Sequence, residues 1–251
     1  MKRFPAIVIL CLLVSCGGGK VRRYTAEAVA QYPHDTLSYT QGLFFNDGRL
    51  YESTGLNGLS TLREVDLQTG SALQRVDFEP EIFAEGCVPV DDWMYVMTWQ
   101  NGRIFRFGLD SLELRWAGDY PREGWGITTD GEDLYASDGS AHIYVMDREL
   151  RLKRKLTVRN DGKTVRWLNE LEWIDGKIWA NVYCTDLIVV IDPRTGDVCR
   201  IIDCSKIYPA KTRRPGDDVL NGIALNPADG KVYITGKNWP WLYEIVLRSA
   251  K

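Results

Sequence analysis

Histidine is scarce in this chain, which has only His34 and His142 among 251 residues. Its six cysteines show no paired C-x-x-C spacing of the kind that binds zinc. The sequence therefore predicts no metal site and no other cofactor. Excess charge of one sign is missing as well, because the formal net charge is -3 and basic residues are interspersed with acidic ones. Nucleic-acid binding requires a basic patch, so we expect no nucleic-acid partner.

An apolar run long enough to cross a membrane is also missing, since a spanning helix needs roughly 20 residues. The run from Phe4 to Val14 is about half that length, follows a basic pair and precedes Ser15-Cys16. This order is typical of a secretory signal peptide, and residues 13–16 are similar to a bacterial lipobox. We expect residues 1–15 to be a lipoprotein signal peptide, Cys16 to be lipidated and residues 16–23 to form a tether. The protein would then be exported to the bacterial cell envelope and touch the membrane only through this lipid.

The body keeps four further cysteines, Cys87, Cys184, Cys199 and Cys204. An even number of cysteines in an exported protein permits disulfides. Four cysteines allow three pairings, and the sequence does not choose among them.

What is abundant is an internal repeat, in which an aromatic residue follows a turn five times. These anchor aromatics are spaced 44, 40, 44 and 54 residues apart, at Tyr51, Tyr95, Tyr135, Trp179 and Tyr233. A period of roughly 40 to 50 residues made of short strands is typical of a β-propeller blade, which cannot bury both faces without neighbours. We therefore predict an all-β fold, a single five-bladed β-propeller over residues 24–251.

Period-2 alternation divides the first repeat into four strands, at residues 39–45, 49–53, 61–67 and 72–78. The fifth repeat ends after its third strand, while residues 24–32 precede the first repeat with no blade of their own. We expect this N-terminal strand to complete the last blade and close the ring, which removes an exposed sheet edge. The irregular segment 205–218 is either a functional loop or a solvated excursion.

The first strand of each propeller blade lines the central channel, so its start faces the axis. Aligning the five starts gives one ring of residues: Gln41, Glu85, Trp125, Asn169 and Asn221. One carboxyl, three amides and an indole suit recognition of a peptide-like ligand, with a single acid for proton transfer. Four of the five, all except Asn169, are followed directly by glycine, which lets the backbones approach closely near the axis.

A second ring lies four residues after each anchor aromatic and consists of Gly55, Trp99, Gly139, Tyr183 and Lys237. Two aromatics and a lysine on some blades, with glycine on others, indicate a pocket on one side of the ring. The alternative is that these side chains merely fill the channel. Filling is the weaker interpretation for Glu85, because a carboxyl among aromatics is costly unless its protonation or pairing has a use.

Several motifs together resemble the plant-type glutaminyl-peptide cyclotransferases, also called glutamine cyclotransferases. They are Tyr39-Thr40-Gln41-Gly42-Leu43, Phe83-Ala84-Glu85-Gly86, Glu123-Gly124-Trp125-Gly126, Asn169-Glu170-Leu171-Glu172, Trp179-Ala180-Asn181, Leu220-Asn221-Gly222-Ile223-Ala224 and Thr235-Gly236-Lys237-Asn238-Trp239-Pro240. The resemblance covers residues 32–245. It implies a five-bladed propeller that converts N-terminal glutamine of peptides or proteins into pyroglutamate and releases ammonia without a metal.

The resemblance also implies roles for individual residues. By this resemblance Glu85 is the essential acid, and we expect it to act as both general acid and general base. Lys237 and Asn169 are the other expected catalytic residues. The implied substrate-binding residues are Gln41, Tyr39, Phe83, Trp99, Trp125, Tyr183 and Asn221. Tyr39 and Tyr183 depart from the phenylalanine and tryptophan common in the family, which bears on substrate preference.

Two points stay open at the level of sequence. Lys237 could stabilise the oxyanion of the tetrahedral intermediate or hold Glu85 ionised. The rival functions are a non-catalytic envelope lipoprotein that binds peptides or glycans, and a lactonase-type hydrolase with calcium near Glu170 and Asp138. For the enzyme we expect a monomer.

Overall fold

The computed structural model describes residues 21–250, which form an all-β, propeller-like arrangement of sheets with one short 3-10 helix, η1 (Ala210–Thr212). The predicted signal peptide and Cys16 lie outside the described residues. Within the described part, no helix is long and apolar enough to span a membrane.

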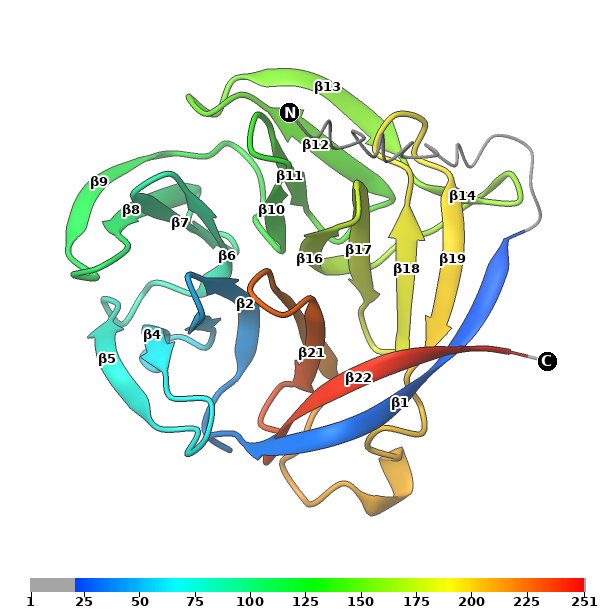
Figure 1. Ribbon diagram of the computed structural model, residues 1–251. Helices are drawn as coiled ribbons and strands as arrows, with labels where there is room; N and C mark the ends of the chain where they lie inside the picture. Colours follow the sequence, from blue (N-terminus) through cyan, green and yellow to red (C-terminus); the bar gives the residue numbers. More distant parts are fainter. Residues whose placement is uncertain (1–20, 251) are drawn as a thin grey trace, which may run out of the picture.

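Three four-stranded antiparallel sheets follow one another along the chain (Figure 1). The first contains β2 (Thr40–Asn46), β3 (Arg49–Thr54), β4 (Thr61–Val65) and β5 (Ala72–Asp77). The second contains β6 (Ala84–Val90), β7 (Trp93–Thr98), β8 (Arg103–Gly108) and β9 (Leu114–Asp119), and the third β10 (Ile127–Thr129), β11 (Leu134–Ser137), β12 (His142–Met146) and β13 (Leu152–Thr157). The four strands expected for the first repeat are confirmed, each end lying within two residues of its predicted place.

An eight-stranded sheet takes up the rest of the chain, in the order β16-β17-β18-β19-β1-β22-β21-β20. Its strands are β16 (Leu168–Ile174), β17 (Lys177–Val182), β18 (Leu187–Ile191), β19 (Val198–Asp203), β20 (Leu220–Asn226), β21 (Lys231–Gly236), β22 (Trp241–Ser249) and β1 (Arg22–Pro33). A small hairpin, β14 (Arg159–Asn160) and β15 (Lys163–Thr164), lies apart from it.

The N-terminal strand pairs with the last strand of the chain, where it was expected to complete the last blade, and runs antiparallel to it. Residues 24–33 of β1 pair with residues 241–249 of β22. The strand begins at Arg22, inside the stretch expected to be a tether, because Arg22–Thr25 also pair in parallel with Arg200–Asp203 of β19. One strand thus joins two parts of the sheet that are far apart in sequence (Figure 1).

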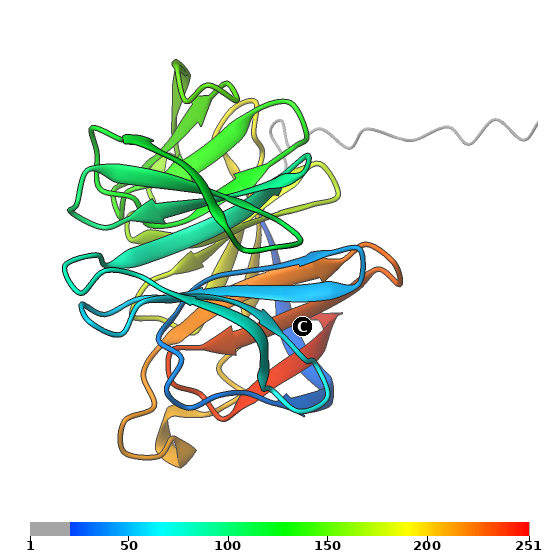
Figure 2. The same cartoon turned by 90° about the vertical axis from the view of Figure 1, so that its left-hand side faces the viewer.

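The first strands of the sheets lie around a common centre, and the outer strands lie at the rim (Figure 1). Strand β2 contacts β6 and β20, β10 contacts β6 and β16, and β16 contacts β20. The segment that carries η1, within the irregular residues 205–218, projects from the edge of the molecule in the side view (Figure 2).

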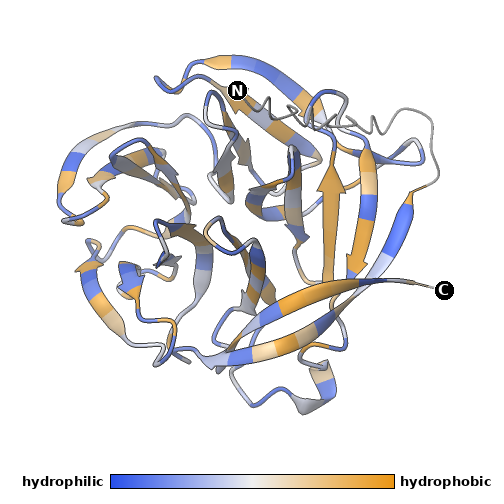
Figure 3. Ribbon diagram, in the orientation of Figure 1, coloured by the Kyte–Doolittle hydropathy of each residue, from blue (hydrophilic) through white to orange (hydrophobic). Residues whose placement is uncertain are grey.

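The anchor aromatics pack inside the protein, and all five are at most 5% exposed. The middle strand β18 (LIVVI) is hydrophobic along its length, whereas the rim strand β13 carries three basic residues (Figure 3). Burial therefore follows the distance of a strand from the rim. Among the described cysteines, Cys87, Cys184 and Cys204 are free thiols, so no two of the four body cysteines are joined to each other.

Candidate active site

A cavity of about 320 Å³ lies where the first strands of the sheets begin. It is lined by Tyr39, Gln41, Phe83, Glu85, Trp99, Trp125, Trp167, Asn169, Tyr183 and Lys237. Nine of the ten catalytic and substrate-binding residues expected from sequence are in this set. The tenth, Asn221, does not line the cavity but contacts a residue that does: its side-chain amide donates to the carbonyl of Thr40 at 3.0 Å and to Gln41 Oε1 at 3.4 Å.

β-bulges aim the polar residues of the first ring at this cavity. The register of β2 against β3 shifts at Gln41, and that of β6 against β7 shifts at Glu85-Gly86. The same shift occurs in β16 at Asn169-Glu170 and in β20 at Asn221-Gly222. A bulge adds a residue to one strand and redirects its side chain. Three first strands thereby place Gln41, Glu85 and Asn169 in the cavity, and the fourth places Asn221 beside Gln41.

Glycines that follow first-ring residues, and glycines of the second ring, make space that a side chain would fill. A Cβ on Gly126 would lie 2.1 Å from the Asn169 carbonyl oxygen, so neighbouring inner strands could not approach so closely. In the second ring, a Cβ on Gly55 would lie 2.3 Å from the ring of Phe83, and one on Gly139 2.6 Å from that of Trp125. The disagreement between repeats thus has a cause: glycine on two blades gives room for the aromatic rings of the cavity.

A chain of side-chain hydrogen bonds crosses the cavity floor. Lys237 Nζ donates to Gln41 Oε1 at 2.6 Å, and Gln41 Nε2 donates to Glu85 Oε1 at 3.0 Å. All three side chains belong to residues at most 5% exposed. The orientation of the Gln41 amide is fixed, because its oxygen accepts from Lys237 and its nitrogen donates to Glu85. Gln41 therefore links the lysine to the glutamate.

Burial shifts the pKa values of the two ionisable groups in opposite senses. Loss of water raises the pKa of Glu85 well above its usual value, and the negative charge of Glu123 raises it further, against the opposing effect of Lys237. Loss of water lowers the pKa of Lys237 to about 8, although Glu85 and Asp218 pull it upward. The two pKa values are therefore shifted toward each other, as is common for the titratable groups of a catalytic site.

Aromatic rings surround the lysine and form the walls. Lys237 Nζ lies 4.4 Å from the ring centre of Tyr39 and 5.4 Å from that of Tyr183. Phe83 and Trp99 meet edge to face at 5.5 Å, as do Trp125 and Tyr183 at 5.6 Å. A cation facing π-electron clouds keeps some stabilisation without water, which suits a dry cavity.

Asn169 offers the cavity an unused acceptor. Its Oδ1 atom is buried and has no hydrogen-bond partner among the described residues. A buried polar atom without a partner costs about 1–3 kcal/mol. A ligand N–H group placed in the cavity would remove that cost.

Two residues of the site were missed by the sequence analysis. Trp167 lines the cavity with a half-exposed indole and a left-handed backbone, φ +64°. Glu123 accepts the indole N–H groups of Trp99 and Trp125 at 3.1 and 3.3 Å. Both stand two residues before a first-ring position, as Tyr39 and Phe83 do. The aligned strand starts contained both residues, but only the first-ring position was compared between repeats.

The carboxylates considered for a calcium site are held by protein donors. Glu170 Oε2 accepts the backbone N–H of Ile223 at 2.9 Å. Asp138 accepts the Tyr144 hydroxyl at 2.9 Å and the backbone N–H of Ser140 at 3.0 Å. The two residues therefore serve local structure.

Comparison with known proteins places this site in a family. Residues 7–247 match the family model described as glutamine cyclotransferase. The chain is 38% identical over 229 residues to glutaminyl-peptide cyclotransferase of Arabidopsis thaliana, covering 89% of this chain and 72% of that protein.

Solved structures agree. The crystal structure of Myxococcus xanthus glutaminyl cyclase is 32% identical, with a TM-score of 0.86 over 92% of this chain and 100% of the other. Hydrazine synthase of Kuenenia stuttgartiensis matches at 16% identity and a TM-score of 0.50, over 87% of this chain and 65% of the other, a likeness of fold alone. Cavity, motifs and comparisons lead to one conclusion: this chain belongs to the glutamine cyclotransferase family.

Proposed function

We propose that this protein is a glutaminyl-peptide cyclotransferase, which converts the N-terminal glutamine of peptides or proteins into pyroglutamate and releases ammonia. The observation that carries the proposal is the buried Lys237–Gln41–Glu85 chain at the floor of an aromatic cavity. Family membership supports the same activity.

Orientation is the first contribution of the site. The α-amine and the side-chain amide carbon belong to one residue, so the reactants are already tethered and the cavity has to hold them in a reactive geometry. The rings of Phe83, Trp99 and Trp125 would grip the methylene groups and exclude water. The Oδ1 atom of Asn169 would accept an N–H of the substrate, since it has no described partner.

Proton transfer is the second contribution. The amine attacks the amide carbon, a C–N bond forms, and the carbonyl oxygen becomes an oxyanion. The amine must lose a proton and the amide nitrogen must gain one before the C–N bond to ammonia breaks. Glu85 would carry this proton between the two nitrogens, a role usually worth about 10²- to 10⁴-fold in rate.

Lys237 would support Glu85 through the shared glutamine. Its Nζ is bonded to Gln41 Oε1 and flanked by two tyrosine rings. This placement favours the electrostatic role, in which the cation holds part of the Glu85 population ionised, over direct contact with the oxyanion.

The proposal is tested by ammonia release and by mass spectrometry for the matching loss from a short Gln-initiated peptide. The same peptide with an acetylated N-terminus is the matched control, because its amine cannot attack. We expect cyclisation of the free peptide only, unchanged by a strong chelator. No ammonia from a folded protein across several peptides would reject the activity and favour a peptide- or glycan-binding protein.

We also infer that the ring has five blades. The eight-stranded sheet divides at the short parallel pairing of β1 with β19, which leaves β16–β19 as one blade and β20, β21, β22 and β1 as another. The N-terminal strand would then complete the last blade.

We retain the envelope lipoprotein as a proposal, with a monomeric enzyme tethered through Cys16. Its support is the sequence around residues 4–16 alone. Labelling cells with a radioactive fatty acid would test it, and we expect label on the wild type and none on Cys16→Ala.

A further inference from the structure

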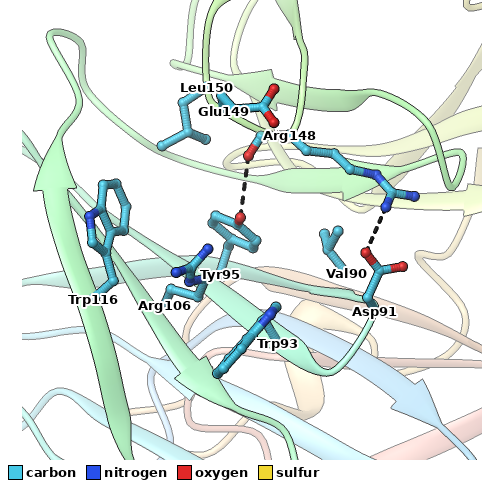
Figure 4. Close-up of a pocket in the computed structure, with 9 residues that line it drawn as sticks. All are labelled: Val90, Asp91, Trp93, Tyr95, Arg106, Trp116, Arg148, Glu149 and Leu150. Carbon is cyan, nitrogen blue, oxygen red and sulfur yellow. Dashed lines mark hydrogen bonds and ion pairs between the residues drawn. The ribbon is translucent and has the colours of Figure 1, made fainter.

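A second cavity, of about 480 Å³, lies away from the candidate active site. It is lined by Val90, Asp91, Trp93, Tyr95, Arg106, Trp116, Arg148, Glu149 and Leu150 (Figure 4). Trp93 begins β7, whereas Trp99, in the first cavity, follows its other end. Six strand residues span about 20 Å, so the two cavities are separate and the cyclisation machinery does not use the second.

Its centre is an arginine between two indoles. The guanidinium carbon of Arg106 lies 5.0 Å from the ring centre of Trp93 and 5.7 Å from that of Trp116. No ion pair or hydrogen bond of this guanidinium to another described residue is formed, and its Nε is buried without a partner. By contrast, Arg148 pairs with Asp91 at 2.6 Å (Figure 4). Arg106 is therefore the uncompensated charge of the cavity.

The repeats show that this arrangement is particular to one blade. Where Trp93 stands two residues before its anchor aromatic, the other repeats carry charged side chains: Arg49, Asp133, Lys177 and Lys231. Opposite the anchor, Arg106 replaces Glu64, Val145, Val190 and Glu244. One strand further out, Trp116 replaces Gln74, Arg154, Arg200 and Ala30.

The two tryptophans differ in burial, because Trp93 is partly buried against the core between two sheets, whereas Trp116 is exposed. Trp116 is 40% exposed on the outer strand of its sheet, at a place where other repeats are polar or small. Three substitutions that coincide in one blade and meet in one cavity indicate a binding site rather than a variation in packing.

The chemistry of the lining defines the ligand class. The Arg106 guanidinium is close to two indoles and has no described hydrogen-bond partner, so its N–H groups are available to bind a carboxylate. The carboxylates of Asp91 and Glu149 line the same cavity, where they are paired with Arg148 and Arg151, and they can still accept sugar hydroxyls. The single unpaired cation among the described lining residues, Arg106, therefore matches a singly charged carboxylate better than a multiply charged phosphate. Indole faces suit the apolar face of a sugar ring. We propose that this cavity binds an acidic sugar, a hexuronate, with its carboxylate on Arg106 and its ring against Trp116.

The test is a titration of the full-length protein by calorimetry and saturation-transfer NMR. Sodium glucuronate is the probe; glucose, which has the ring without the charge, and acetate, which has the charge without the ring, are its controls. We expect saturable glucuronate binding at least about tenfold tighter than that of either control, since a charge-assisted hydrogen bond is worth about a factor of ten. A tetramer of uronate residues distinguishes the two sources of such a ligand. If only the monomeric uronate binds, the ligand is a free sugar acid; if the tetramer binds as well, the cavity accepts the end of a polysaccharide chain.

Variants locate the binding. Two variants, Arg106→Gln on β8 and Trp116→Leu on β9, should each weaken glucuronate binding about tenfold and leave the rate of cyclisation unchanged. Arg103→Gln is the matched control, because Arg103 lies on the same strand β8 and stacks on Phe105 outside this cavity. The proposal is overturned if folded wild type shows no saturable glucuronate binding, if glucose or acetate binds equally, or if Arg103→Gln weakens binding as much as Arg106→Gln.

Discussion

Two charges of opposite sign act on the Glu85 carboxyl, Lys237 lowering its pKa and Glu123 raising it. Removing each should therefore move the pH dependence of kcat/KM in opposite directions. In Glu123→Gln the pKa of Glu85 falls, and the limb that it controls moves to lower pH. In Lys237→Met the pKa rises, and that limb moves to higher pH.

The pH–rate profile of each variant on a Gln-initiated peptide makes this measurement. Glutamine at position 123 keeps one acceptor oxygen for the indoles of Trp99 and Trp125, so we expect KM to rise only a few-fold. If the limb controlled by Glu85 moves in the same direction in both variants, the two charges do not act through Glu85.

At the scale of an element, a buried charge network holds the segment that leads into β2. Glu52 accepts from His34 at 3.0 Å and is paired with Arg63, while His34 Nδ1 bonds the Trp239 carbonyl at 2.7 Å. The segments that carry Gln41 and Lys237 are thereby joined. Although burial alone would raise it, Arg63 and His34 lower the pKa of Glu52 to about 2.

This network gives stability a defined pH window. The folded pKa of Glu52 is below its ordinary value of 4.5, so its contribution is present above that pH and lost as pH falls toward 2. Burial would lower the pKa of His34, but Glu52 raises it above 6.5, so its contribution is complete below 6.5 and lost as pH rises through the folded value. The network should stabilise most between 4.5 and 6.5.

Urea unfolding of wild type and Glu52→Gln across pH tests this window. Removing one member of a buried ion pair costs about 3–5 kcal/mol, and we expect that difference near pH 5.5 and a much smaller one near pH 2.5. A difference independent of pH would mean that the network is not ionised as described.

Sequence patterns predicted the strands and most of the residues that line the cavity. They did not predict the bulges that turn the polar side chains toward it. The spacing of the anchor aromatics was enough to identify the repeats, because each repeat buries one aromatic residue in an equivalent place. The bulges at Gln41, Glu85 and Asn169 depend on register between strands, which period-2 alternation does not reveal. Asn221, expected to bind substrate, does not line the cavity, because its side chain donates to the Thr40 carbonyl and to Gln41.

For the whole molecule, the architecture depends on β1, which joins the end of the chain to the sheet edge at β19. Ala26 of β1 is 1% exposed and packs in a core cluster with Ile245 and Ile202. Ala26→Glu should cost about 3 kcal/mol or more, since it buries an unpaired charge.

Ala28→Glu is the matched control, because Ala28 is exposed on the same strand. It should change the free energy of unfolding by no more than about 0.5 kcal/mol. Equal effects of the two substitutions in a denaturant titration would show that β1 is not packed as an integral strand.

The most direct test of the account is the rate of pyroglutamate formation by wild type and Glu85→Gln on the same Gln-initiated peptide, with circular dichroism to verify folding. Glutamine retains the size of Glu85 and a bond to Gln41 but cannot carry the proton. We predict a loss of about 10²-fold or more in kcat with the fold intact. A folded Glu85→Gln protein that turns over at nearly the wild-type rate would contradict the assignment of Glu85 and, with it, the proposed mechanism.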